Sequence, residues 1–344
     1  MKALGYGAKN TYNRYCYEES SPVANLFLNL KYMIERDGKD KSGVYFTDVH
    51  HYKDVHLLEN EAYLPLGFLA EPELANVNFL ASKGTFDFQN ELFTAATGME
   101  GDVWYRLQGE YTSIVGNGVT ITEKTGTGFC DYTGAEKNSS ITYSYIVDRD
   151  GFCCIHLNLP KRNDYHVILN GTELYRETIS LPQMIAVGDV VAGDILDIRI
   201  DCDAGEDSTM TVIAAVMDDT LFRMGYDKLA ASTLELITFE NTFVEGTIDC
   251  DRDGLLYTSI PQNGGWTAEI DGKPAEITLI GDAMVGLQLT EGNHTVTFRY
   301  RNEAFSLGWK ISLVCLVIFA LLIRWECRRS GWNPMARKKG KYQK

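Results

Sequence analysis

Apolar and polar residues alternate through much of the chain between residues 101 and 304, the pattern of half-buried antiparallel strands. The alternation is clearest at 266–270 and at 296–300, where every second residue is apolar. Two residue pairs suited to tight hairpin turns, Asn170-Gly171 and Asp271-Gly272, follow such runs. The pattern therefore predicts that this part of the chain is built from β-hairpins.

The sequence Asp-Arg-Asp-Gly occurs at 148–151 and again at 251–254. In both places an apolar stretch follows, and then an alternating run that ends in a tight turn. This internal repeat predicts two tandem β-sandwiches of jelly-roll or immunoglobulin-like type, over 101–217 and 237–304. Apolar residues at helical spacing within 218–236 predict a helix that links them.

Residues 1–100 follow a different pattern. Ser21-Pro22 is typical of a helix start, because serine caps the first turn and proline suits its first position. A second helix is predicted over 87–96, ended by Gly98. Short strands are expected between residues 44 and 70, so this region is predicted to be a small α/β unit.

The most apolar segment lies near the C-terminus. Residues 311–323 contain no charge, and Trp309 and Trp325 flank them. As a helix, the nineteen residues 307–325 would be about 28 Å long, close to the hydrocarbon thickness of a bilayer, which is roughly 30 Å. A buried core helix is the alternative, but the basic run that follows disfavours it. The predicted fold is mainly β, with one transmembrane helix over 305–325.

Charge is distributed unevenly along the chain. The net charge is −15, but from residue 310 onward there are nine Lys or Arg and one acid, and residues 1–309 carry a net −23. An acidic body disfavours a nucleic-acid partner. Basic flanks stay in the cytoplasm, which predicts a plasma-membrane protein with a cytoplasmic tail over 326–344 and an extracytoplasmic body.

Export of such a body requires a signal, and residues 1–10 contain no apolar leader segment. We therefore expect membrane spans upstream of this chain. On this hypothesis the chain is the C-terminal piece of a larger membrane protein, and its partners are the lipid bilayer and that upstream transmembrane core.

Several motifs in one order resemble the YfhO family of bacterial membrane proteins. They are the sequences at 26–34, 62–68, 86–90, 259–272 and 292–300, and the last span follows them. The resemblance covers nearly the whole chain. It departs from the family pattern at two places: Gly84-Thr85 stands where the family tends to have Asn-Pro, and no Pro-Gly turn follows Tyr300.

The resemblance implies similarity to lipid-dependent glycosyltransferases that use a polyprenyl-phosphate sugar and modify envelope polymers such as lipoteichoic acid. Their catalytic machinery lies in upstream spans. We therefore expect a glycan-handling domain that is non-catalytic alone and binds no cofactor. A structural or adhesive surface protein that binds a glycan or another envelope partner is the alternative. An independent hydrolase would need two carboxylates in one cleft.

Aromatic residues can form stacking platforms for sugars. Trp266, after two glycines, is the first candidate for glycan binding, with Gln89 and Asn90 as polar candidates. The competing interpretation is structural, with Trp266 in the second sandwich core and the two amides ordering a helix start.

Metal binding finds weak support. Asp249, Asp251 and Asp253 with Gly254 reproduce the first half of a calcium loop, but Ile260 stands where a bidentate glutamate is required. An acidic turn between strands is the better interpretation, and no metal is predicted.

Two other clusters are also interpreted as structural. His50-His51 with His56, Asp48 and Asp54 could suggest zinc, but adjacent strand residues point to opposite faces, so one of the pair could meet His56. The acidic run at 201–207 is interpreted as a solvated loop. No disulfide pairing is predicted among the six cysteines outside the span, Cys16, Cys130, Cys153, Cys154, Cys202 and Cys250.

Overall fold

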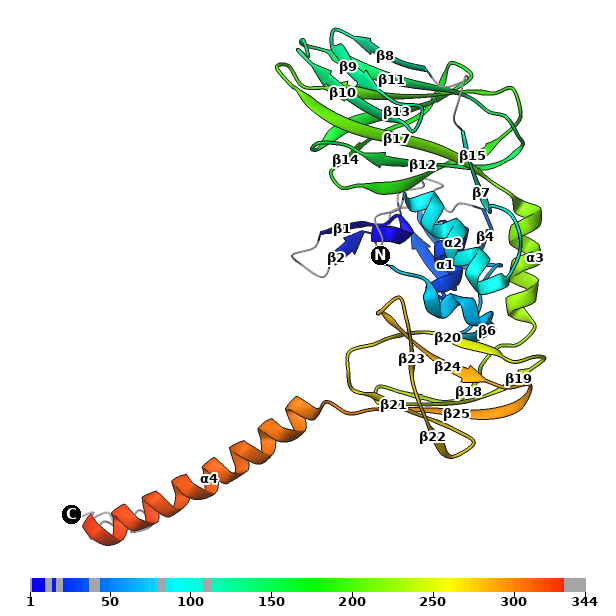
Figure 1. Ribbon diagram of the computed structural model, residues 1–344. Helices are drawn as coiled ribbons and strands as arrows, with labels where there is room; N and C mark the ends of the chain where they lie inside the picture. The colour runs from blue at the N-terminus through cyan, green and yellow to red at the C-terminus, as the bar shows by residue number, and fades with distance from the viewer. Residues whose placement is uncertain are drawn as a thin grey trace.

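The computed structural model describes residues 2–9, 14–16, 21–36, 44–79, 84–107 and 113–330. In this part of the chain, a first β-sandwich, a central α/β layer and a second β-sandwich are stacked, and a long helix leaves the second sandwich (Figure 1). The predicted fold class, mainly β with sandwiches and one apolar C-terminal helix, is confirmed.

The first sandwich consists of two antiparallel sheets. One has the strand order β15-β12-β17-β10-β9 with β7 paired to β17, and the other has the order β14-β13-β16-β11-β8. Alternate residues of both sheets, such as Tyr143, Ile155 and Ile198, are buried between them. The strand bounds are β7 Trp104–Leu107, β8 Ser113–Asn117, β9 Thr120–Lys124, β10 Phe129–Thr133, β11 Ser139–Ile146, β12 Gly151–Asn158, β13 Asn163–Leu169, β14 Thr172–Ile179, β15 Gln183–Val190, β16 Ile195–Cys202 and β17 Ser208–Met217.

The second sandwich has sheets ordered β18-β19-β25-β21-β22 and β23-β24-β20-β6. Its core includes Val244, Leu256, Leu287 and Phe298. The strand bounds are β6 Gly67–Ala70, β18 Glu235–Glu240, β19 Phe243–Cys250, β20 Gly254–Pro261, β21 Trp266–Ile270, β22 Lys273–Ala275, β23 Thr278–Ile280, β24 Met284–Leu289 and β25 Gly292–Tyr300.

Eight strands of one sandwich have a counterpart in the other, and β7, β9, β10 and β23 have none. The order β14-β13-β16-β11-β8 corresponds to β22-β21-β25-β19-β18, and β15-β12-β17 corresponds to β24-β20-β6. The strand β6 takes the position of β17 because the chain leaves the second sandwich directly after β25. The predicted range 237–304 therefore omits a strand, since β6 comes from the N-terminal region and pairs antiparallel with β20.

The repeated Asp-Arg-Asp-Gly sequence has the same structural role in both sandwiches. Its second aspartate, Asp150 or Asp253, accepts a hydrogen bond from a backbone N–H of a distant turn, that of Ala192 at 2.8 Å or Glu291 at 2.7 Å. This shared side-chain cap explains why the motif precedes β12 and β20, the equivalent strands of the repeat.

The helices of the central layer begin and end with the predicted caps. Ser21 Oγ accepts a hydrogen bond from the N–H of Ala24, and Gly98 adopts a left-handed conformation with φ +65° after the second helix. The elements of this layer are the 3-10 helix η1 Lys2–Leu4, β1 Gly7–Lys9, β2 Arg14–Cys16, α1 Pro22–Phe27, the 3-10 helix η2 Pro72–Asn76, α2 Thr85–Thr97 and α3 Asp219–Ala230.

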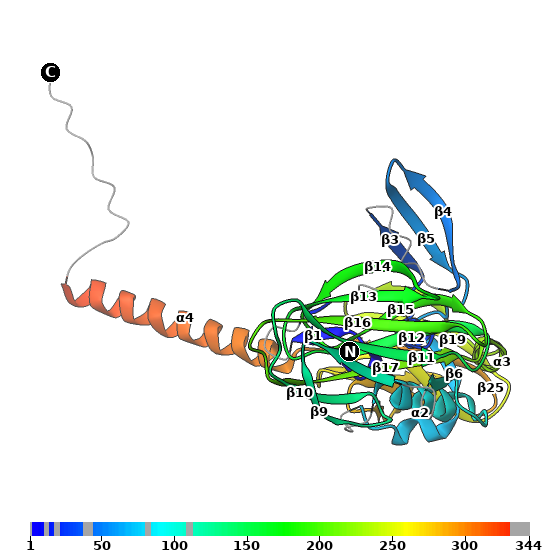
Figure 2. The same cartoon turned by 90° about the horizontal axis from the view of Figure 1, so that it is seen from above.

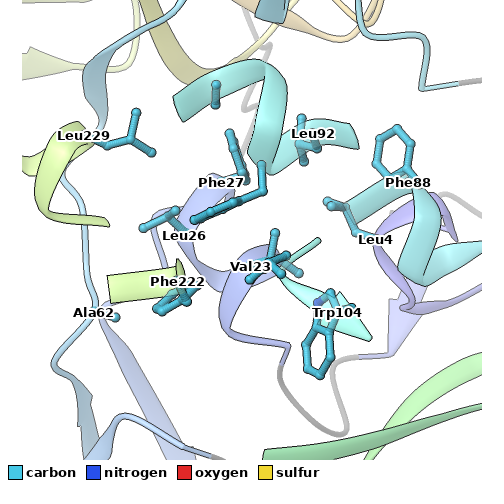
Figure 3. Close-up of a cluster of buried hydrophobic side chains, with 14 of the residues drawn as sticks. Leu4, Val23, Leu26, Phe27, Ala62, Phe88, Leu92, Trp104, Phe222 and Leu229 are labelled. Atoms are coloured by element: carbon cyan, nitrogen blue, oxygen red, sulfur yellow. The ribbon is translucent and has the colours of Figure 1, made fainter. Parts of the chain in front are cut away.

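A continuous apolar core joins the central layer to both sandwiches. Figure 3 shows Val23 and Phe27 of α1, Leu92 of α2 and Phe222 of α3 gathered in it. The same core includes Tyr257 of β20 and residues of β12 and β17. The central layer therefore packs against both sandwiches and is more than a linker between them.

A three-stranded antiparallel sheet projects from the central layer (Figure 2). It consists of β3 Tyr32–Glu35, β5 Val55–Asn60 and β4 Phe46–Tyr52, in that order across the sheet. Exposed apolar side chains lie on it, among them Ile34 and Tyr52. Two of the short strands predicted between residues 44 and 70, β4 and β5, are therefore present, but they belong to this projecting sheet and contribute little to the core.

The C-terminal helix α4, Glu303–Ser330, follows β25 and stands away from the body (Figures 1 and 2). Residues Glu303–Arg329 are long and apolar enough to cross a membrane, and none of their apolar window is buried against the body. Trp309 and Trp325 are both exposed. This exposure excludes the core-helix alternative. Residues 331–344 of the predicted tail lie outside the described residues.

Candidate functional site

Gln89 lies in α2 with no exposed surface, and its amide is bonded within the protein. Its Oε1 accepts hydrogen bonds from Ser21 Oγ at 2.6 Å and from Trp104 Nε1 at 2.8 Å, while Nε2 donates to the Leu4 carbonyl at 3.0 Å. The side chain thus connects η1, α1, α2 and β7. This placement favours the structural interpretation of Gln89, and its glycan role stays a prediction.

Asn90 is buried beside Gln89 and holds β7 against α2. Its Oδ1 accepts a hydrogen bond from Trp104 N at 2.7 Å, and its Nδ2 donates to Trp104 O at 2.9 Å. The residue nevertheless lines a groove of about 770 Å³ along α2. Asn90 therefore combines a structural contact with a place at the edge of an open groove.

The groove along α2 brings six carboxylates together, which the sequence did not indicate. They are Glu71, Glu73, Asp87, Glu91, Glu100 and Asp102. Lys228 and Arg252 lie 2.8 and 3.2 Å from Glu71, and Arg106 pairs with Asp87. The net negative charge favours hydroxyl-bearing or cationic ligands over anionic ones. We refer to it below as the acidic groove.

Trp266 opens β21 and packs against the second sandwich core while remaining half-buried. Its ring lies 5.2 Å from that of Tyr300, which ends β25 shortly before α4 begins. A side chain at Gly265 would collide with the Tyr300 ring, which accounts for the glycine. Trp266 lies at the end of the body nearest to α4, far from Gln89 and Asn90 along the fold.

Two of the three aspartates of the calcium-like sequence are engaged with protein groups, and Asp249 is exposed on β19. Asp253 caps the turn at Glu291, and Asp251 contacts Ser232 and Arg252. Across the described ranges, no three His, Cys, Asp or Glu side chains are grouped so that they could hold a metal ion.

The histidine cluster lies on the projecting sheet. His56 Nδ1 is 2.6 Å from Asp48 Oδ2, and the His51 ring stacks on His56 at 5.6 Å. His51 is the histidine of the adjacent pair that meets His56, as strand alternation requires. The hydrogen bond to Asp48 raises the pKa of His56 and lowers that of the carboxyl.

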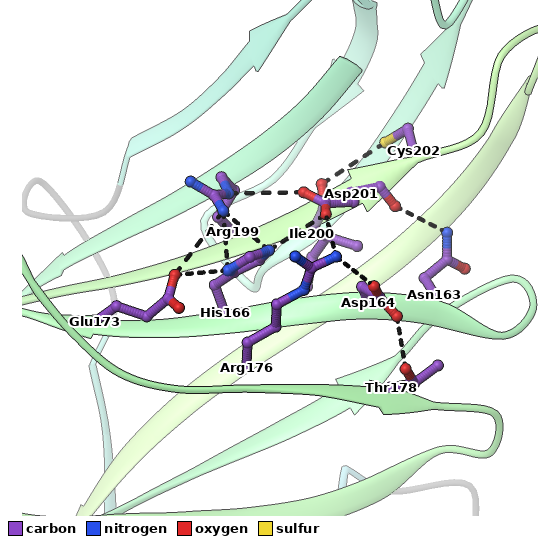
Figure 4. A network of polar contacts seen from close by, with 10 residues as sticks. All are labelled: Asn163, Asp164, His166, Glu173, Arg176, Thr178, Arg199, Ile200, Asp201 and Cys202. Carbon is purple, nitrogen blue, oxygen red and sulfur yellow. Dashed lines mark hydrogen bonds and ion pairs between the residues drawn. The ribbon is translucent and has the colours of Figure 1, made fainter. Parts of the chain in front are cut away.

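A charged network covers the outer face of the first sandwich on β13, β14 and β16 (Figure 4). His166, only 2% exposed, lies between Glu173 at 2.7 Å and Asp201 at 3.2 Å. Arg199 lies against the imidazole ring. Each charged side chain here faces an opposite charge or a hydrogen-bond partner, so the network ties three strands together.

Beside this network, a groove of about 470 Å³ lies between three turns at one end of the first sandwich. Its lining includes Lys137, Ser139, Arg162, Asn163 and the start of the acidic run at 201–207. We refer to it as the end groove. The acidic run is contiguous in the sequence, whereas the basic and amide residues that face it come from two other turns, so the sequence pattern alone does not bring them together.

Cys130, Cys153, Cys202 and Cys250 are free and buried, and Cys154 is buried as well. Burial raises the pKa of Cys153 and Cys202 to about 12 and that of Cys250 to about 11. Such thiols are poor nucleophiles and metal ligands at neutral pH. The side chain of Cys16 lies outside the described residues.

Similar solved structures include a family 35 carbohydrate binding module from Clostridium thermocellum, at 11% identity and TM-score 0.25, covering 33% of this chain and 98% of that one. Another is the cycloisomaltooligosaccharide glucanotransferase of a Paenibacillus species, at 8% identity and TM-score 0.25, covering 56% of this chain and 45% of that one. Similarity at these scores says nothing about a ligand.

No curated protein matches this chain. Residues 1–312, which include the body and the start of α4, match the family described as "Bacterial membrane protein YfhO". The match spans most of the chain, and α4 provides the membrane helix that such a protein requires. The chain belongs to the YfhO family of bacterial membrane proteins.

Proposed function

We propose that this chain is the extracytoplasmic, glycan-handling domain of a YfhO-type membrane glycosyltransferase that modifies a cell-envelope polymer. Helix α4 holds the body at the membrane surface, and the transfer reaction takes place in an upstream transmembrane core. The chain by itself is non-catalytic.

The observation that carries this proposal is the connection between body and membrane helix. Strand β25 ends at Tyr300 and α4 begins at Glu303, so only two residues separate the second sandwich from the helix. Two extended residues span about 7 Å, which keeps this sandwich close to the headgroups. A body held so close to the bilayer is suited to present a glycan to a membrane-embedded active site.

Two features of the body support a glycan as ligand. The acidic groove offers carboxylates, Asn90 and Thr94, groups that hydrogen-bond sugar hydroxyls. Trp266 offers a half-exposed ring at the end of the body nearest to the membrane. We propose these two places as contact points, with the amide of Gln89 supporting the first from within the core.

A structural or adhesive role in the envelope remains the second candidate. The projecting sheet favours it, because exposed apolar residues such as Tyr32, Ile34 and Tyr52 suit contact with another macromolecule. Binding without an effect on polymer glycosylation would support this candidate.

The sidedness of the domain is tested by labelling Cys327, near the end of α4, with a membrane-impermeant maleimide. The other described cysteines of the body are buried, and Cys315 lies within the span. In a Cys16→Ser background, intact cells should show no labelling and inverted membrane vesicles should show it. The reverse result would contradict an extracytoplasmic body.

Function is tested with a strain that lacks the complete protein. The upstream core together with this chain should restore envelope-polymer glycosylation, and either part alone should not. Turnover of a polyprenyl-phosphate sugar by the purified chain alone would contradict a non-catalytic role.

A further inference from the structure

The end groove holds basic side chains and buried polar atoms without hydrogen-bond partners, although the body as a whole is acidic. It lies where the turns before β11 and β13 and the turn after β16 meet. A volume of about 470 Å³ falls within the usual range of small-ligand sites.

Each carboxylate of the end groove has a partner within the protein. Asp164 accepts hydrogen bonds from Arg176 and Thr178, each at 2.6 Å, and these contacts lower its pKa. Asp203 lies 2.8 Å from Lys161. Asp201 contacts the charged network through His166 and Arg199. These contacts offset part of the negative charge that the acids add to the groove.

Two cations on its rim have no such neighbour. Lys137 and Arg162 are exposed, and within the described residues neither forms an ion pair or side-chain hydrogen bond. Residues 1–309 carry a net charge of −23, so two unpaired bases on one groove are a marked local exception. An anionic group is the ligand that they would attract, and the arginine can bind it through two N–H groups.

Two buried polar atoms lie at the base of the same groove. Asn163 is 4% exposed and donates through Nδ2 to the Asp201 carbonyl at 3.0 Å, but its Oδ1 has no hydrogen-bond partner. Ser139 is 2% exposed, and its Oγ also has no partner. An unsatisfied buried polar atom is costly, so ordered water or a ligand hydroxyl is expected to reach it.

The end groove lies at the end of the first sandwich opposite to α3. Strand β17 begins shortly after the turn that lines this groove and is followed by α3. Helix α3 lies on the right of the body in Figure 1, whereas α4 leaves on the left. The repeat agrees, because the end of β16 at the groove corresponds to the end of β25, from which α4 continues.

We propose that the end groove binds an acidic saccharide unit. Lys137 and Arg162 bind its carboxylate or phosphate, and Asn163 and Ser139 bind its hydroxyls directly or through ordered water. This inference rests on the proposed glycan-handling function and assigns to it a second site, separate from the acidic groove. The two sites differ in that the end groove has unpaired cations on its rim, whereas the acidic groove is lined by six carboxylates.

The test uses the full chain in lipid nanodiscs with glucuronate, glucose 6-phosphate, glucose and inorganic phosphate as probes, and binding is measured by calorimetry and ligand-observed NMR. At least one acidic sugar should bind about tenfold more tightly than glucose, and weaken with added salt. Preference between the two acidic sugars identifies whether the anion is a carboxylate or a phosphate.

The double variant Lys137→Gln, Arg162→Gln should lose about tenfold or more in affinity for the acidic sugar, with an unchanged thermal midpoint because both side chains are exposed. Lys273→Gln, an exposed lysine of the second sandwich, is the matched control and should change nothing.

Three results would overturn the inference. Equal affinity for inorganic phosphate and the sugar phosphate would show that hydroxyl groups contribute nothing. Unchanged affinity in the double variant would place the anion elsewhere. Binding of neutral glycans with no binding of acidic sugars would leave the proposed function standing and remove this site, whereas failure of every glycan to bind would reject both.

Discussion

At the scale of single residues, the protein places amides and carboxylates where they join segments distant in the sequence. Gln89 contacts Ser21, 68 residues earlier, and Leu4, 85 residues earlier. Asp271 accepts a hydrogen bond from the backbone N–H of Thr295 at 2.9 Å, and Asn170 accepts the equivalent bond from Ile195 at 2.9 Å. These polar groups fix the geometry of the fold as much as the apolar core does.

Replacing Gln89 by leucine keeps the volume but removes the partners of Ser21 and Trp104. Because each buried group left unsatisfied costs about 1–3 kcal/mol, we expect Gln89→Leu to lower the free energy of unfolding by roughly 2–4 kcal/mol. Chemical denaturation of the purified chain measures the loss. Gln288→Leu, at an exposed position of β24, is the control. Normal stability with altered glycan binding would instead support a ligand role for Gln89.

Between about pH 5.5 and 8, one hairpin should respond to pH through a histidine, and its repeat counterpart, which has Asp194 at that position, should not. His294 Nδ1 is 2.8 Å from Asp271 Oδ2, which raises the pKa of His294 and lowers that of Asp271. The raised histidine pKa stabilises the fold fully below its unfolded value, near 6.5, and the effect is lost as pH rises through the folded pKa. The lowered aspartate pKa stabilises the fold above about 3.8, and that effect is lost on acidification through the folded pKa.

We therefore expect this contact to contribute most between about pH 4 and 6.5. Chemical denaturation at pH 5.5 and at pH 8 measures the free energy of unfolding of the unmodified protein and of His294→Ala. The difference between the two pH values should be smaller in the variant. Asp194→Asn is the matched control, because Asp194 pairs with the non-titrating amide of Asn170 in the first sandwich. An unchanged pH profile in His294→Ala would reject the contact as its source.

The buried thiols should be inert in the folded protein. Because burial raises the pKa of Cys153, Cys202 and Cys250 to between about 11 and 12, we expect no alkylation at pH 8 without denaturant. Mass spectrometry after iodoacetamide treatment measures it, with denatured protein as the positive control. Modification in the native state would show that the sandwich core around the modified cysteine opens readily.

At the scale of elements, the second sandwich depends on a strand from the far end of the chain. Leu69 of β6 is fully buried in its core, and β6 pairs with β20 over four residues. In the first sandwich the equivalent strand, β17, is contiguous with its own unit. We therefore expect folding of the second sandwich to require the N-terminal region.

Truncation of Leu69 tests this dependence. We expect Leu69→Ala to cost about 2–5 kcal/mol and to speed hydrogen exchange in β20 and β24 before it affects β11 and β16. Leu174→Ala, at an exposed position of β14, serves as the control. If hydrogen exchange becomes faster only near Leu69, while β20 and β24 stay protected, the sandwich is stable without β6.

At the scale of the whole molecule, the central layer makes one body of two similar sandwiches. Its core contains residues of α1, α2 and α3 together with residues from both sandwiches. Helix α3 packs closely on α2, because a side chain at Gly225 would collide with the Phe93 ring. This core holds the first sandwich against the central layer and the second sandwich, from which α4 continues.

The sequence by itself determined the local features of this protein. The alternation of apolar and polar residues predicted strands. Ser21-Pro22 and Gly98 predicted helix ends, and the uncharged stretch at 311–323 predicted the membrane helix. The repeat predicted two sandwiches of equal design. These features follow from periodicity and backbone preference, which act within a few residues.

Only the tertiary structure decided which distant segments meet. Periodicity tells which face of a strand is buried, but it does not tell which segment pairs with its edge, so β6 could not be assigned to β20. Nor does it tell whether an amide such as Gln89 faces a ligand or a buried partner. The end groove arises from three turns that are separate in sequence, and its charge balance depends on pairings that exist only after folding.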